Sequence, residues 1–226
     1  MERDEGVTGT RLRTPRAAAV AGIVFSVLLV LALVLLIVAT PKDPTRAGTW
    51  LSDSSRRGAV AVALNLIPFA GIAFLWFIGV VRDRVGEHED RFFATVFLGS
   101  GLLFVAMLFV AAAFAGGLIA EVTGGSAIEP GRDVLANGRQ ITSLLLRVYA
   151  MRMAAVFMIS TATITLRTRV IPQWIGIVGY VFAAVLLVSV GLTPWVTLLF
   201  PVWIFVLSVE ILRSALRPAP PAAVGG

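Results

Sequence analysis

The chain has 226 residues, 58% of them hydrophobic, and a mean hydropathy of +0.92. Soluble globular domains contain about 45–50% apolar residues, so this composition predicts a membrane protein. The chain has no cysteine and one histidine, His88. Disulfides, thiol nucleophiles, cysteine-ligated metals and a histidine-rich metal site within one chain are therefore excluded.

The net charge of +6 comes mainly from arginine, because Lys42 is the one lysine among 19 basic residues. On a soluble protein, such a charge can indicate a nucleic-acid partner. Here the arginines mostly flank apolar segments, where they anchor helices, and no basic stripe with interleaved aromatic residues is present. We therefore expect no nucleic-acid partner. The abundance of arginine, alanine, valine and glycine indicates a GC-rich bacterial genome.

Residues 1–16 are polar and charged, which predicts a disordered cytosolic tail. Apolar segments follow at 17–39, 59–81, 92–120, 141–166, 173–191 and 194–212. A helix needs about 20 residues to cross a bilayer core of about 30 Å, so each segment is a candidate span. We predict an all-α, polytopic membrane protein with a six-helix transmembrane domain over 17–213 and a second cytosolic tail at 214–226.

The orientation follows from the distribution of lysine and arginine. If the N-terminus is cytosolic, eleven basic residues lie in inner segments and six in outer loops, with Arg147 and Arg152 inside a span. Cytosolic segments carry the excess of positive charge, so we predict that both termini are cytosolic. The first segment exceeds the 7–15-residue apolar core of a secretory signal, and "VATPKD" is a poor cleavage site, which predicts an uncleaved anchor.

Two prolines and several small residues shape the predicted helices. Pro68 and Pro201 lie inside the second and sixth segments, and each removes a backbone hydrogen bond there. Close approach of helices is predicted at three stretches of small residues, namely "GSG" (99–101), "AAAFAGG" (111–117) and "GIVG" (176–179).

The fourth segment contains two arginines in "LLLRVYAMRMAAV" (144–156). The fourteen uncharged residues between Arg152 and Arg167 make about 21 Å of helix, which is too short to cross a bilayer. Arg152 must therefore lie within the membrane zone. It either snorkels toward the head groups, as we expect for Arg147, or lies in the bundle interior and holds a carboxylate or an anionic ligand group.

Three further residues accompany Arg152 in the outer half of the predicted bundle. Glu121 closes the third segment near the predicted level of Arg147, so we consider a pair with either arginine. Tyr149 lies on nearly the same helix face as Arg152 and is either an interface residue or a pocket residue. Asn65 bonds across helices, satisfies freed backbone or contacts a ligand. We predict a ligand-binding cavity lined by Asn65, Glu121, Tyr149 and Arg152.

Glu210 lies near the inner end of the sixth segment. A local ion pair with Arg213, three residues later, is one interpretation, and a proton or cation site is the other. The acidic residues around His88 in "RDRVGEHEDR" (82–91) are interpreted as a charged turn rather than a metal site. Walker, H-E-x-x-H and Rossmann glycine patterns are absent, so the sequence predicts no catalytic residue, no metal and no cofactor.

The second half of the chain carries a resemblance to known sequences. The stretches "YAMRMAAVFMIST" (149–161), "RTRVIPQWIGIVGY" (167–180) and "PWVTLLFPVWIFVLSVEIL" (194–212) are similar to parts of uncharacterised multi-pass membrane proteins common in bacteria, notably actinobacteria. The resemblance implies a six-helix fold of the same sort. It implies no activity for any residue.

For function, the sequence favours a non-enzymatic bundle in the bacterial cell membrane that binds a lipid, a small ligand or a partner protein within the bilayer. A small solute or ion transporter or channel is the alternative, favoured by the two prolines inside helices and the ionisable groups in spans. A membrane-embedded enzyme is the third reading, and its acids would have to come from the outer loop at 121–140.

Overall fold

A computed structural model of the chain describes residues 14–40, 53–85, 91–123, 132–168, 172–189 and 193–216. Nearly all of these residues are helical, and no strand occurs in these ranges. Five helical stretches have the length and apolar composition to cross a membrane, and a further apolar helix is shorter. The predicted all-α fold is confirmed. Most of the two predicted tails, together with Lys42 and His88, lie outside the described residues.

The first three helices are α1 (Thr14–Ala39), α2 (Ser54–Val85) and α3 (Arg91–Thr123). A long continuous rod follows, made of α4 (Arg132–Leu144), the π-helical turn η2 (Leu145–Ala150) and α5 (Met151–Thr168). The chain then forms α6 (Gln173–Val188), the 3-10 turn η3 (Pro194–Leu198) and α7 (Leu199–Leu216).

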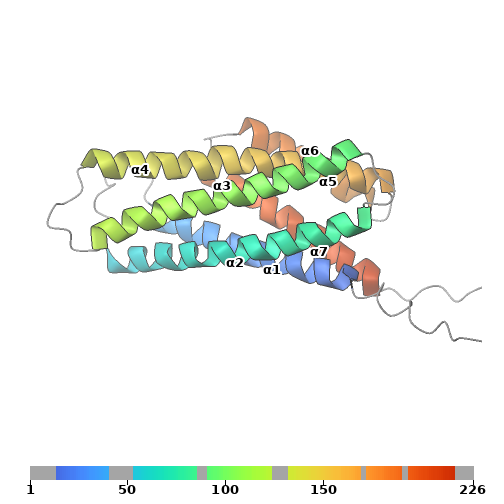
Figure 1. Ribbon diagram of the computed structural model, residues 1–226, viewed down its shortest axis with the longest axis horizontal. Helices are drawn as coiled ribbons and strands as arrows, with labels where there is room; N and C mark the ends of the chain where they lie inside the picture. The colour runs from blue at the N-terminus through green and yellow to red at the C-terminus, as the bar shows by residue number, and fades with distance from the viewer. Residues whose placement is uncertain are drawn as a thin grey trace, which may run out of the picture.

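The long helices run roughly side by side, and the start of α1 lies at the same end of the bundle as the end of α7 (Figure 1). We call this the proximal end. At the opposite, distal end, α1 and α3 finish and α2 and α4 begin (Figure 1). α1 packs against α2 and α7, α3 packs against α2 and the rod, and α6 packs mainly against α5. This arrangement leaves α6 at the edge of the bundle.

Two helices begin earlier than the apolar pattern predicts. α2 starts at Ser54 because Asp53 caps it, with its Oδ1 accepting from the backbone N–H of Ser55 at 3.0 Å. The rod starts at Arg132 instead of residue 141. Its polar first turns are held against α3, since a β-carbon at Gly138 would lie 3.1 Å from the side chain of Leu118. Much of the predicted loop at 121–140 is therefore helix.

The six predicted spans become five long helices and a short one. The sixteen residues of α6 extend about 24 Å, less than the about 30 Å of a bilayer core. Pro201 lies at the start of α7, where the 3-10 turn gives way to the α-helix. Its missing N–H therefore falls at a helix boundary, where a proline disturbs few hydrogen bonds.

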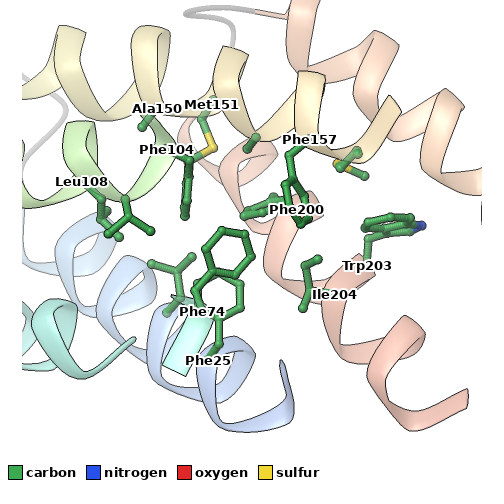
Figure 2. Close-up of a cluster of buried hydrophobic side chains, with 14 of the residues drawn as sticks. Phe25, Phe74, Phe104, Leu108, Ala150, Met151, Phe157, Phe200, Trp203 and Ile204 are labelled. Atoms are coloured by element: carbon green, nitrogen blue, oxygen red, sulfur yellow. The ribbon is translucent and has the colours of Figure 1, made fainter. Parts of the chain in front are cut away.

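Five phenylalanines from five helices fill the centre of the bundle (Figure 2). The ring of Phe74 in α2 lies 4.4 Å from that of Phe25, 5.1 Å from that of Phe157, 5.4 Å from that of Phe104 and 5.7 Å from that of Phe200, measured between centroids. Most of these pairs are tilted or edge-to-face, which are favoured geometries for aromatic rings. All five side chains are fully buried, so this phenylalanine cluster closes the middle of the bundle.

Small residues let two helices approach α6 closely, as the "GIVG" stretch predicts. A β-carbon at Gly176 would collide with Leu166 of α5, and one at Gly179 would collide with Trp203 of α7. The indole N–H of Trp203 donates to the backbone carbonyl of Ile175 at 3.0 Å. In contrast, nothing lies within 4 Å of a β-carbon built on Gly99, Gly116 or Gly117. The prediction of close approach is confirmed at "GIVG" and at Gly101, where a β-carbon would collide with Ile78, but does not hold at those three glycines.

Candidate functional site

A cavity of about 170 Å³ lies at the distal end of the bundle and is the candidate site. Five parts of the chain wall it: the end of α1, the start of α2, the end of α3, the rod, and η3. We call it the distal cavity. Its lining residues are Leu33, Leu36, Ile37, Thr40, Val60, Ala115, Leu118, Ile119, Arg139, Thr142, Ser143, Leu146, Arg147, Pro194 and Thr197.

The two sides of the distal cavity differ in chemistry. The side formed by α1, α2 and α3 is aliphatic except for Thr40. The side formed by the rod carries the guanidinium groups of Arg139 and Arg147 and the hydroxyls of Thr142 and Ser143. Apolar walls with a few convergent polar groups are typical of ligand sites. The cavity therefore suits a molecule with one charged or polar end and one apolar end.

Arg147 is the residue around which the site is built. Its side chain is half-buried and borders the distal cavity on one side. On the other side it borders a small cavity of about 20 Å³, which Ser189, Thr193 and Thr197 also line. That volume is enough for about one water molecule. Among the side chains that the structure describes, no carboxylate pairs with Arg147, and the charged group that acts on it is another cation, Arg139.

The π-helical turn explains how Arg147 comes to face the cavity. On α4 the inward series is Arg139, Ser143 and Leu146, at α-helical spacing. On α5 it is Met151, Ala154 and Met158, which an α-helix would extend back to Arg147. The two series are offset by one residue. The wider i→i+5 turn of η2 absorbs this residue, so that both Leu146 and Arg147 line the cavity.

The structure does not bring together the four residues predicted to bind a ligand. Arg152 and Tyr149 are exposed on the outside of the rod, and Glu121 is exposed near the end of α3. Asn65 is exposed on α2, where its Nδ2 donates to the carbonyl of Ala61, one turn earlier, at 2.8 Å. None of the four lines either of the two cavities described above. Their ligand-binding role stays a prediction.

Glu121 and Arg147 lie at different depths. Gly138 lies against Leu118, which sets the register between the rod and α3. Arg147 is nine residues further along the rod, about 13 Å, and Glu121 is three residues beyond Leu118 in the other direction, about 5 Å. The separation along the helix axis is thus about 18 Å, too far for a direct pair. The expectation of a common level fails because α4 occupies 132–140, which the apolar pattern assigns to a loop.

Glu210 and Arg213 lie near the end of α7, at the proximal end of the bundle, which is opposite the distal cavity. Arg213 Nη1 is 3.8 Å from Glu210 Oε2, and the side chain of Arg213 is 70% exposed. An ion pair of this geometry contributes at most a few tenths of a kcal/mol, about 0.5 or less. Its role is local to the last turns of α7.

The sequence analysis treats Arg147 as a head-group anchor or as an ion-pair partner of Glu121, and it does not find the polar residues of α4. A signal for them exists in the sequence. Arg139, Thr142, Ser143 and Leu146 follow the spacing i, i+3, i+4 and i+7, which places them on one helix face. The polar character of 132–140 conceals this helical spacing, because a search for apolar windows stops where arginine, asparagine and glycine enter.

Comparison with known proteins adds no family to this description: no family model, no curated protein and no solved structure matches the chain.

Proposed function

We propose that the chain is a polytopic protein of a bacterial cell membrane, with six crossings and both termini in the cytosol, whose function is to bind a lipid molecule in the distal cavity. In this proposal the protein is a binding bundle, with no catalytic step. The observation that carries it is the distal cavity itself, which joins an aliphatic wall to an arginine-bearing wall.

The position of the cavity along the helices supports a lipid as its ligand. The wall residues Ala115–Ile119 belong to the apolar part of α3, where Val110 and Phe114 are exposed on the outer surface at the depth of the bilayer. The end of α6 and the start of η3 lie at the level of Arg147, since Ser189 and Thr193 border the same small cavity. Within the described residues, α6 and α7 therefore do not continue beyond that level beside α1, α3 and α4. Lipid is the solvent available to fill such a space.

The closed centre of the bundle favours binding over transport. A solute path would have to lead from the distal cavity past the five stacked and edge-packed phenylalanine rings. Fully buried aromatic residues at native packing density leave no room for water. Transport would therefore require a large rearrangement of the core, whereas lipid binding needs only the cavity as it stands.

Exposed tryptophans support the crossing of α6 in this topology. Trp174 begins α6 and is 52% exposed, and Trp195 follows its end and is 47% exposed. Tryptophan is enriched at both interfaces of a membrane, so a pair that brackets a short helix is typical of a short span. A short hydrophobic helix can cross by local thinning of the bilayer.

The test is to fill the cavity and measure the lipid that the protein retains. Ala115→Phe places a ring in the distal cavity, and Ala113→Phe places the same ring on the exposed face of α3. We expect native mass spectrometry of the mildly purified protein to show one bound lipid on the wild type and on Ala113→Phe, and none on Ala115→Phe. Wild-type protein that retains no lipid, or equal retention by both variants, would contradict the proposal.

A further inference from the structure

We propose that the lipid in the distal cavity is an anionic phospholipid whose phosphate is held by the guanidinium of Arg147, with Arg139 beside it. This inference rests on the proposed function and names its ligand class. The aliphatic wall of α1 and α3 then contacts the first methylene groups of the acyl chains. The cavity, at about 170 Å³, is smaller than the pockets of about 300 Å³ or more that enclose a drug-sized ligand, so most of each chain lies in the bilayer.

The charges of the site call for an anion. Arg139 and Arg147 line one cavity, and its described lining contains no aspartate or glutamate. Two like charges repel, and the repulsion grows as the surroundings become less polar. A charged residue at membrane depth is stable when it pairs with an opposite charge or a polar group. For Arg147, no described carboxylate supplies that charge, and a phosphate in the cavity would supply it from outside the protein.

The geometry of the rod directs Arg147 toward such a phosphate. Side chains on a helix lean toward its N-terminus, so Arg147 leans toward Ser143 and the distal end. Arg139 lies eight residues earlier, about 12 Å along the axis, and by the same rule it leans further toward the distal end. A guanidinium offers planar, paired donors that match two phosphate oxygens. Arg147 therefore forms the floor of the site and Arg139 its mouth.

Ser143 supplies a further donor at the same place. It lines the cavity one turn before Arg147, and within the described residues its hydroxyl makes no hydrogen bond. The hydroxyls of Thr142 and Thr197 differ, because each donates to a backbone carbonyl, that of Gly138 and that of Pro194 respectively. Ser143 is thus the hydroxyl that is free to donate to a phosphate oxygen.

The same lining selects against zwitterionic lipids. A choline or ethanolamine head carries a cation next to its phosphate, and this cation would lie close to the charge of Arg147, which holds the phosphate. No described carboxylate in the lining could stabilise it. A head group that ends in glycerol brings no second cation and avoids this repulsion. The site is therefore expected to prefer phosphatidylglycerol to phosphatidylcholine.

The experiment measures thermal unfolding and native mass spectra of the full chain in detergent with phosphatidylglycerol, phosphatidylcholine or inorganic phosphate. We expect phosphatidylglycerol to raise the unfolding temperature and bind as one molecule, and the other two to have little effect at equal concentration. Arg147→Gln should weaken phosphatidylglycerol binding at least tenfold, Arg147→Lys less, and Ser143→Ala severalfold. Arg82→Gln, which removes the same charge from an exposed position near the proximal end of α2, should leave it unchanged.

Each of the other outcomes would contradict one specific part of the proposal. If both lipids bind alike and Arg147→Gln has no effect, the choice of an anionic lipid is wrong, while the proposed lipid-binding function stands. If inorganic phosphate stabilises as well as phosphatidylglycerol, the site takes a small anion. If Arg152→Gln removes binding and Arg147→Gln does not, the ligand lies on the exposed face of the rod. If no lipid is retained at all, the proposed function fails.

Should Arg147→Gln not fold, Arg139→Gln tests the same site from its mouth, with a severalfold loss of phosphatidylglycerol binding expected.

Discussion

Phe74 contacts a phenylalanine ring on each of four other helices, α1, α3, α5 and α7. Inside a bilayer, burial of apolar surface contributes little to helix association, because the lipid chains are as apolar as the side chains. The attraction then comes from close packing, which a ring in contact with four others maximises. Phe74 is therefore the residue at which packing of the bundle is concentrated.

Replacement of this ring should destabilise the whole bundle. We expect Phe74→Ala to lower the free energy of unfolding by about 3–5 kcal/mol, because it leaves a cavity in the core. Phe69→Ala on the same helix is the control, since Phe69 is 64% exposed. Its expected effect is within about 0.5 kcal/mol. Unfolding in mixed detergent micelles measures both variants, and equal losses would show that the cluster does not carry the packing.

A second close contact joins α1 to α7 through Gly22 and Ser208. A β-carbon on Gly22 would overlap Ser208 Oγ and come within 2.8 Å of the ring of Phe77. Ser208 Oγ is buried and has no hydrogen-bond partner among the described residues. Gly22 lies beside it, and a glycine Cα–H makes at best a weak hydrogen bond. The glycine is therefore required for close approach, while the serine hydroxyl adds little stability.

The two residues should respond differently to alanine. We expect Gly22→Ala to destabilise the bundle by about 1–3 kcal/mol through overpacking, and Ser208→Ala to be neutral or slightly stabilising because an unsatisfied hydroxyl is lost. The double variant should recover part of the loss, since removal of Oγ makes room for the new methyl. Thermal unfolding of the three variants checks this, and a Ser208→Ala loss as large as that of Gly22→Ala would refute it.

At the residue scale, the spacing of residues around Arg147 indicates that its side chain faces the bundle, which the length of the apolar segment does not reveal. Arg147 lies seven residues before Ala154, two turns along the same helix face, and Ala154 is buried. Small residues mark the faces on which membrane helices pack. Arg152 instead follows Tyr149 on a face of large side chains, and both are exposed. The length argument correctly keeps Arg152 within the segment but does not tell inward from outward.

At the scale of elements, η2 couples the cavity to the core. It lets α4 present Arg139 and Ser143 to the distal cavity, while α5 keeps Met151 and Ala154 in the bundle core. A π turn within an α-helix acts as a one-residue insertion and is frequent at functional sites. Here the π turn absorbs the extra residue and so aligns two faces that an uninterrupted α-helix of the same sequence would set out of register.

Deletion of the extra residue should turn Arg147 away from the cavity. Deletion of Val148 is expected to restore a continuous α-helix in which Arg139, Ser143 and Leu146 stay on one face with Met151 and Ala154. Arg147 would then lie about 100° away from that face, so we expect loss of lipid retention with little change in the unfolding temperature. Deletion of Gly125, between α3 and α4, keeps the register of the rod and is the control. Unchanged lipid retention after deletion of Val148 would show that the π turn is not needed.

The apolar segments were sufficient to predict where most helices lie and where some of them begin or end, but not how far α2 and the rod extend. α1 finishes at Ala39 and α6 starts at Gln173, as the apolar runs indicate. α2 and the rod extend past their runs, because Asp53 caps one and contact between Gly138 and Leu118 holds the other. Such tertiary contacts leave no periodic trace in hydropathy, so the distal cavity, to which the extended rod contributes Arg139, could not be predicted.

At the scale of the whole molecule, the role of α6 decides the topology. Each crossing moves the chain to the other side of the membrane, so six crossings return the C-terminus to the side of the N-terminus and five do not. The start of α1 and the end of α7 lie at one end of the bundle (Figure 1), as an even number requires. The excess of arginine in the segments at that end supports the proposed location of both termini in the cytosol.

A cysteine scan tests this topology directly, because the chain has no cysteine of its own. Ser54 at the start of α2 and Ser214 near the end of α7 are both exposed. We expect Ser54→Cys to react with a membrane-impermeant maleimide in intact cells, and Ser214→Cys to react only after the membrane is permeabilised. Reaction of both in intact cells would mean that α6 folds back without crossing. The reverse pattern, with only Ser214→Cys reactive in intact cells, would keep six crossings but place the arginine-rich end outside the cell.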